Sequence, residues 1–371
     1  MTKPLRFHWS LSQAGDPFRR AQSTLKQRGL LSLEAQLALC RRAEACGIES
    51  MLMAIGFSRP DPMLLSVALG LETEHIKFMV ACRAGLLSPT TFVQQVNTVS
   101  ALLQGRICLN MVCGHTPHEL RYYGDFLPHD ARYERTDEFL SICRAYWRCE
   151  AEVNFHGTYY HIVQGRIHTP FVSPERTAPE IYLGGNSPQA VALATRHASC
   201  LWHLAVAPEA LRPHIPPIAQ TGMEMGLLVS LLARPTREEA VRDAYALIRR
   251  FGAETREVHR EFASRSDSVG FTSTYRLAAG TTSDWATPYL WTGAVPYLGA
   301  PAIALVGGAE DIATAIMDYK RIGITQFLFM GWPDIDEMTF FGREILPLIR
   351  RMEQEAASTP QQAAGAYAMA E

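Results

Sequence analysis

Short apolar runs alternate with longer amphipathic segments over most of the chain. Most of these runs are continuous rather than strictly alternating, which is typical of strands buried on both faces of a sheet. Several end at a glycine, where a strand passes into a loop. The predicted strands are residues 5–10, 50–56, 76–85, 107–114, 180–185, 199–206, 226–233 and 325–331.

Helical spacing of apolar residues fills the intervals between these runs. Ser88-Pro89 and Ser187-Pro188 each place a capping serine before a proline at the first helical position. No Gly-x-Gly-x-x-Gly follows the first run, which argues against an open dinucleotide-binding sheet. Eight strand–helix units predict a (β/α)8 TIM barrel. The other predicted helices are residues 33–46, 132–147, 237–251, 310–321 and 336–352.

Two stretches depart from the repeat. Residues 151–170 predict a β-hairpin insertion that turns at Gly157. Residues 252–300 are rich in Ser, Thr, Gly and aromatic residues, and we expect a long mobile lid loop before the last strand. We expect residues 1–354 to form a single barrel domain and the Ala/Gln-rich residues 355–371 to be a disordered tail.

Composition narrows the functional class. The 371 residues carry a formal net charge of -2, which argues against nucleic acid as a partner. No window is apolar enough to span a membrane, and no signal peptide is evident, so we expect a cytoplasmic protein. The eight cysteines include no Cys-x-x-Cys pair and are interpreted as reduced, mostly buried thiols.

In a barrel of this type the chemistry lies at the carboxyl ends of the strands. Gly184-Gly185-Asn186-Ser187-Pro188 combines a glycine turn with a capped helix N-terminus, an arrangement that can bind a phosphate. An ordinary strand–helix turn with a serine cap fits the same residues. The residues expected to ring the mouth are His8, Trp9, Arg59, Arg83, Asn110, Cys113, Gly184, Gly185, Asn186, Ser187, His203, Ser230 and Trp332.

Other chemistries have weaker signals. His115 and His118 are spaced like a metal pair, but no third ligand stands at a recognisable distance, so we expect no metal and interpret them as a polar loop or cofactor contact. No Gly-x-Ser-x-Gly motif occurs, and no paired carboxylates stand at the strand ends. We therefore expect a cofactor to carry the reaction.

The strand ends and the segments between them resemble the bacterial luciferase-like flavin monooxygenases, and within them the two-component alkanesulfonate monooxygenase branch. The resemblance runs from about residue 5 to 350. It is carried by Arg83 with Leu87-Ser88-Pro89-Thr90, Gly105-Arg106 through Asn110-Met111-Val112, Pro117-His118-Glu119-Leu120, Arg132-Tyr133-Glu134, Glu138-Phe139, Tyr182 through Ser187, Ser266-Asp267-Ser268-Val269-Gly270, Leu290-Trp291-Thr292-Gly293 and Ala304-Leu305-Val306-Gly307.

The resemblance implies a barrel that receives reduced FMN from a separate NAD(P)H-dependent flavin reductase. Molecular oxygen would add to the flavin, and the peroxyflavin would oxidise an organic substrate. By the same resemblance Gly185, Asn186, Ser187 and Tyr133 would hold the phosphate. Arg83 and Asn110 would lie near the flavin ring and its ribityl chain. A homodimer or homotetramer is also implied.

Several positions depart from the alkanesulfonate branch. Arg59 replaces a cysteine, Leu228-Val229-Ser230 replaces an Arg-x-His, and Trp332 replaces a tyrosine. Because the cationic partners of a sulfonate are mostly lost, we expect a bulky, largely apolar substrate and no desulfonation. Arg59, Ser230 and Trp332 are the catalytic candidates. The substrate-binding candidates are His8, Trp9, Leu228 and Trp332.

Alternatives remain open for the roles of two residues and for the function of the protein. Arg59 can instead be a solvated loop residue, and Trp332 a plug of the core. An F420-dependent oxidoreductase or a flavin-binding protein that has lost catalysis would also fit this sequence.

Overall fold

The computed structural model describes residues 3–11, 32–57, 59–332 and 334–368. Eight parallel strands follow one another around a closed barrel, and the last pairs with the first. Each of the eight predicted runs overlaps one of them, so the predicted (β/α)8 fold is confirmed. The strands are β1 (Arg6–Ser10), β2 (Ser50–Met53), β3 (Lys77–Cys82), β4 (Ile107–Met111), β7 (Ile181–Gly184), β8 (Cys200–Leu204), β9 (Glu224–Ala233) and β12 (Gln326–Gly331).

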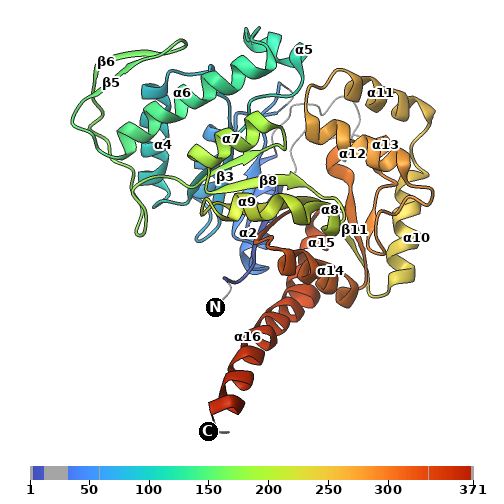
Figure 1. The fold of residues 1–371 in the computed structure, drawn as a ribbon. Coiled ribbons are helices and arrows are strands. Elements are labelled where there is room, and N and C mark those ends of the chain that lie inside the picture. Colours follow the sequence, from blue (N-terminus) through green and yellow to red (C-terminus); the bar gives the residue numbers. More distant parts are fainter. Residues whose placement is uncertain (1–2, 12–31, 58, 333, 369–371) are drawn as a thin grey trace.

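Helices cover the outside of the barrel (Figure 1). Both predicted serine caps are confirmed, since Ser88 Oγ accepts from the Thr91 amide at 3.2 Å and Ser187 Oγ from the Ala190 amide at 3.1 Å. The helices between strands are α2 (Leu33–Ala45), α3 (Pro62–Gly70), α4 (Pro89–Leu102), α5 (Pro117–Leu120), α6 (His129–Trp147), α7 (Pro188–His197), α8 (Pro208–Leu211), α9 (Ile215–Ala219), α10 (Arg237–Ile248), α14 (Ala309–Ile322) and α15 (Asp334–Phe340).

The predicted hairpin is confirmed as β5 (Val153–His156) and β6 (His161–Gly165). The Gly157 amide donates to the Tyr160 carbonyl at 2.9 Å across its turn.

The expectation of a lid loop over residues 252–300 is wrong. This segment forms α11 (Ala253–Ser264), α12 (Val269–Gly280), the short strand β10 (Leu290–Trp291) and α13 (Val295–Leu298). It is followed by β11 (Ala304–Gly307), which extends the sheet beside the carboxyl half of β9. The Ser268 cap and the burial of Trp291 and Leu298 in an apolar cluster stabilise helices despite the loop-like composition.

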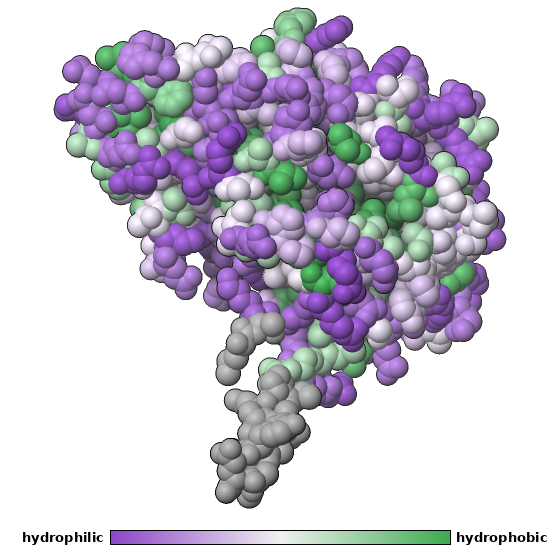
Figure 2. Space-filling model, in the orientation of Figure 1, coloured by the Kyte–Doolittle hydropathy of each residue, from purple (hydrophilic) through white to green (hydrophobic). Residues whose placement is uncertain are grey.

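The tail also differs from the expectation of disorder. Helix α16 (Leu346–Ala368) continues through residues 355–368 and projects away from the barrel (Figure 1). Among the described helices, none is both long and apolar enough to cross a membrane. Figure 2 shows one face of the molecule, on which apolar side chains appear in small separate groups among hydrophilic ones.

Side chains alternate between the barrel interior and the helix layer. The interior contains a separate cluster in which Tyr182 and Trp202 stack at 5.4 Å between ring centres. Gly226 leaves room for the indole, because a β-carbon there would lie 2.2 Å from Trp202. The members of this interior cluster are Leu52, Met79, Cys108, Tyr182, Cys200, Trp202 and Leu328, with Leu228 packed against them.

Candidate active site

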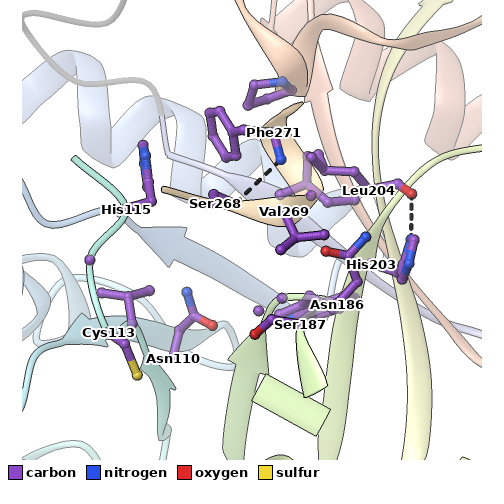
Figure 3. A pocket seen from close by; sticks show the side chains of 18 of the residues that line it. Asn110, Cys113, His115, Asn186, Ser187, His203, Leu204, Ser268, Val269 and Phe271 are labelled. Atoms are coloured by element: carbon purple, nitrogen blue, oxygen red, sulfur yellow. Dashed lines mark hydrogen bonds between the residues drawn. The ribbon is translucent and has the colours of Figure 1, made fainter. Parts of the chain in front are cut away.

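A cavity of about 260 Å³ lies at the carboxyl ends of the barrel strands. Figure 3 shows Asn110, His115, Asn186 and Val269 around it. Its floor is apolar and its rim is polar. The lining residues are Leu52, Asn110, Val112, Cys113, Gly114, His115, His129, Tyr133, Gly184, Gly185, Asn186, Ser187, Trp202, His203, Leu204, Leu228, Asp267, Ser268, Val269, Gly270, Phe271, Pro301 and Leu328.

The turn between β7 and α7 forms one side of the cavity. Gly185 has φ +141°, and a β-carbon there would lie 2.8 Å from the Ala190 Cβ and 3.6 Å from the Tyr133 hydroxyl. Burial raises the pKa of Tyr133, so its hydroxyl stays protonated and can donate. The turn, the helix N-terminus capped by Ser187 and this hydroxyl suit a phosphate.

The N-terminus of α12 forms the facing side. A β-carbon on Gly270 would lie 3.3 Å from the Asn186 Oδ1, so the two turns meet. The buried Arg132 guanidinium holds this arrangement. It donates to the Asp267 carboxylate at 2.5 Å and to the carbonyls of Cys113 and Leu127, each at 3.0 Å. Sequence reasoning did not assign this role to Arg132 or Asp267, although both stand in the quoted motifs.

Two amide side chains of the cavity contain buried oxygens without a described hydrogen-bond partner. These are the Oδ1 atoms of Asn110, on β4, and of Asn186, which follows the neighbouring strand β7. A buried acceptor without a donor is costly, so each atom suits a ligand N–H or O–H group.

Two histidines of the lining have pKa values lowered by burial and are neutral at pH 7. His115 stacks on Phe271 with 4.3 Å between ring centres. His203 donates from Nδ1 to the Leu204 carbonyl at 2.7 Å, which leaves Nε2 as a proton acceptor. His118 packs instead against Tyr122, and the described residues contain no cluster of three or more metal-ligating side chains.

Nine of the residues predicted for the mouth, the cofactor or the substrate come together in the cavity lining. They are Asn110, Cys113, Tyr133, Gly184, Gly185, Asn186, Ser187, His203 and Leu228.

Neither His8 nor Trp9, the predicted substrate contacts on β1, lines the cavity, and the two side chains face opposite sides because they are adjacent in a strand. The Trp9 ring packs outside the barrel wall against Phe329 and Phe341, and its Nε1 donates to Asp334 at 3.2 Å. His8 points inward but lies below the cavity, where it bonds Ser50 and Gln326.

The catalytic candidates Ser230 and Trp332 do not line the cavity either. The Ser230 hydroxyl donates to the Pro301 carbonyl at 2.8 Å and joins β9 to the segment before β11. Trp332 is buried in the apolar cluster of Trp291 and Leu298, as the alternative of a plug of the core expects.

Arg59 and Arg83 lie outside the cavity lining. Arg83 donates to Glu119 at 3.2 Å and lies over the Tyr123 ring at 5.2 Å. Arg59 borders Gly56 beside the same Glu119 carboxylate. The structure therefore brings neither guanidinium to the cavity that we describe.

Residues 5–326 match the family model described as luciferase-like monooxygenase. The chain belongs to the luciferase-like monooxygenase family. The enzyme class expected from the sequence, a flavin-dependent monooxygenase, is confirmed with it.

Solved structures show how far the fold of this monooxygenase is shared. Riboflavin lyase, with modified FMN and riboflavin, is 18% identical over 95% of this chain and 92% of that chain, with a TM-score of 0.76. Long-chain alkane monooxygenase is 19% identical with the same coverage and TM-score. An F420-dependent secondary alcohol dehydrogenase is 17% identical over 94% and 99% of the two chains, with a TM-score of 0.67.

Proposed function

We propose that this monooxygenase uses reduced FMN and molecular oxygen to oxidise a bulky, largely apolar organic substrate. A separate NAD(P)H-dependent flavin reductase would supply the reduced FMN. The observation that supports this most directly is one cavity that joins a phosphate-binding turn to an apolar floor.

The polar residues of the lining suit FMN. The Gly185 turn, the Ser187 helix end and the Tyr133 hydroxyl would hold the phosphate. The Oδ1 atoms of Asn110 and Asn186 would accept from N–H or O–H groups of the ring and the ribityl chain. A bound reduced flavin supplies the electrons that activate oxygen.

The remaining residues would orient the substrate and exclude water. Leu52, Leu228 and Leu328 line the floor and suit an apolar substrate body. The Val269–Phe271 turn, held by the Arg132–Asp267 ion pair, covers the cavity from the other side. The His203 Nε2 is a neutral proton acceptor for this site.

The deciding experiment compares cofactors and oxygen dependence. Titration of the protein with reduced FMN under nitrogen, followed by mixing with oxygenated buffer, should delay the appearance of oxidised FMN relative to free flavin. Oxidation at the rate of free flavin would contradict a monooxygenase that controls the reaction with oxygen.

A second candidate, an F420-dependent oxidoreductase, is favoured by the likeness to the alcohol dehydrogenase. Tight binding of F420 with turnover under nitrogen would favour it over FMN. If the protein binds oxidised FMN but changes neither the reaction of reduced FMN with oxygen nor turnover with F420, it is a flavin-binding protein that has lost catalysis.

Two further expectations can be measured directly. No sulfite should be released from octanesulfonate when a flavin reductase is supplied. The homodimer or homotetramer implied by the resemblance should appear in sedimentation velocity.

A further inference from the structure

The turn end of the β5–β6 hairpin, at the left of Figure 1, brings two histidines together. His156 is the last residue of β5 and His161 is the first residue of β6, and the two stand directly opposite each other in the antiparallel register. Their Nδ1 atoms lie 3.2 Å apart, with 4.2 Å between the ring centres. Because directly opposite residues point to the same face of a hairpin, the imidazoles form one pair.

This pair faces solvent. The neighbouring residues Phe155 and Ile162 pack against the hydrophobic core, so strand alternation turns the two histidines to the outer face of the hairpin. Both histidines are exposed. A dissolved metal ion can therefore reach both rings, and water can complete its coordination shell.

The turn that joins the two histidines is fixed to the body of the protein. The Glu138 carboxylate, on α6, accepts from three successive backbone amides of the turn at 2.7, 2.8 and 3.1 Å. The donors are the amides of Thr158, Tyr159 and Tyr160. Since this anchoring holds the two strand ends at a constant spacing, little conformational freedom is lost when both rings bind one ion.

The separation of the two nitrogens fits a single metal ion. Imidazole nitrogens bind Zn²⁺ at about 2.0–2.1 Å. Two such nitrogens 3.2 Å apart subtend about 100° at the ion, between the ~90° of a square-planar shell and the ~109° of a tetrahedral one. Without metal, one ring donates its Nδ1 proton to the other. Metal binding needs no net loss of this proton, because the donor ring can carry it on Nε2 instead.

We infer that His156 and His161 form a bidentate site for a divalent transition-metal ion, with Cu²⁺ bound more tightly than Zn²⁺. These two rings would be its protein ligands, since no group of three or more candidate ligands occurs within the part of the chain that the structure describes. Water would occupy the other positions, so the ion would bind reversibly at the surface. This inference is independent of the proposed function, because neither histidine lines the cavity.

The test is calorimetric titration of the full chain, without an affinity tag, with CuCl₂ and separately with ZnCl₂ near neutral pH. Cu²⁺ should bind at one strong site, and Zn²⁺ should bind there more weakly. His156→Asn and His161→Asn should each weaken Cu²⁺ binding at least ~10-fold, because chelation needs both rings. For the same reason the double variant should bind Cu²⁺ no more weakly than either single variant. Electron paramagnetic resonance of the wild type with one equivalent of Cu²⁺ should show two nitrogen ligands.

His168→Asn is the matched control, because it removes an exposed histidine that follows the same hairpin. It should leave Cu²⁺ affinity unchanged. Urea unfolding without metal should give the same midpoint for all variants, which separates loss of the site from damage to the fold. The inference is overturned if the single variants bind Cu²⁺ as tightly as the wild type, if the spectrum shows one nitrogen, or if Cu²⁺ binds weakly and equally in every variant, as adventitious contacts would.

Discussion

The two ends of the barrel interior treat polar side chains in opposite ways. At the amino end Arg6 donates to Glu49 at 2.7 and 2.6 Å and to Glu180 at 2.8 Å, and Lys77 donates to Glu49 at 2.8 Å. Above them His8 bonds Ser50 and Gln326. At the carboxyl end the Asn110 and Asn186 oxygens and two Arg83 nitrogens have no described partner.

The polar groups of the two ends therefore serve different purposes: those at the amino end stabilise the fold, and those at the carboxyl end are available to a ligand. Polar groups that satisfy one another inside the protein gain nothing from a ligand, whereas unsatisfied groups gain most when a ligand arrives. We therefore expect substitutions at the amino end to change the free energy of unfolding and those at the mouth to change affinity.

Arg6→Met should destabilise the fold by about 3 kcal/mol, because it removes one of the two cations that bridge the Glu49 and Glu180 carboxylates and leaves only Lys77 between them. Urea denaturation gives the free energy of unfolding, and FMN titration of the folded variant should match the wild type. If the folded variant bound FMN much more weakly than the wild type, the amino end would affect binding as well as stability, and the comparison of the two ends would be contradicted.

The pH dependence of stability should contain a contribution from His8. Burial lowers its pKa to about 4, whereas it titrates near ~6.5 in an unfolded chain. This contribution to the free energy of unfolding is fully present above pH ~6.5 and is lost as the pH falls through 4. It amounts to at most roughly 3 kcal/mol. Unfolding measured from pH 7 to 4 should vary less in His8→Gln than in the wild type; parallel curves would contradict this.

Gly185→Ala should weaken FMN binding roughly 10- to 100-fold. The substitution strains a backbone at φ +141° and places a methyl group 2.8 Å from the Ala190 Cβ. Gly222→Ala is the control, because it has φ +81° but open space around it. Both variants should lose stability, and only the first should lose affinity in a fluorescence titration.

Ser187→Ala should cost about 1 kcal/mol of stability through the lost cap and also reduce FMN affinity. Ser88→Ala removes the same Ser-Pro device from α4 and should affect stability alone. Equal effects of the two substitutions on FMN binding would show that Ser187 acts only as a cap.

The barrel follows from local patterns in the sequence. Continuous apolar runs and Ser-Pro caps are local signals, and each of the eight predicted runs overlaps a barrel strand. The turn that we propose binds phosphate is also a local feature, since Gly185 and Ser187 lie within one short motif. Residues 252–300 were misjudged because α12 packs on the main core through Tyr275 and Leu277 and α13 packs in the cluster around Trp291, which composition does not reveal.

Only the tertiary structure decided which side chains share the site. Strand alternation divides His8 from Trp9, a hydrogen bond across 71 residues occupies Ser230, and the Arg132–Asp267 pair joins residues that are 135 positions apart. Contacts between residues so far apart depend on how the strands and helices pack, and no local pattern encodes them.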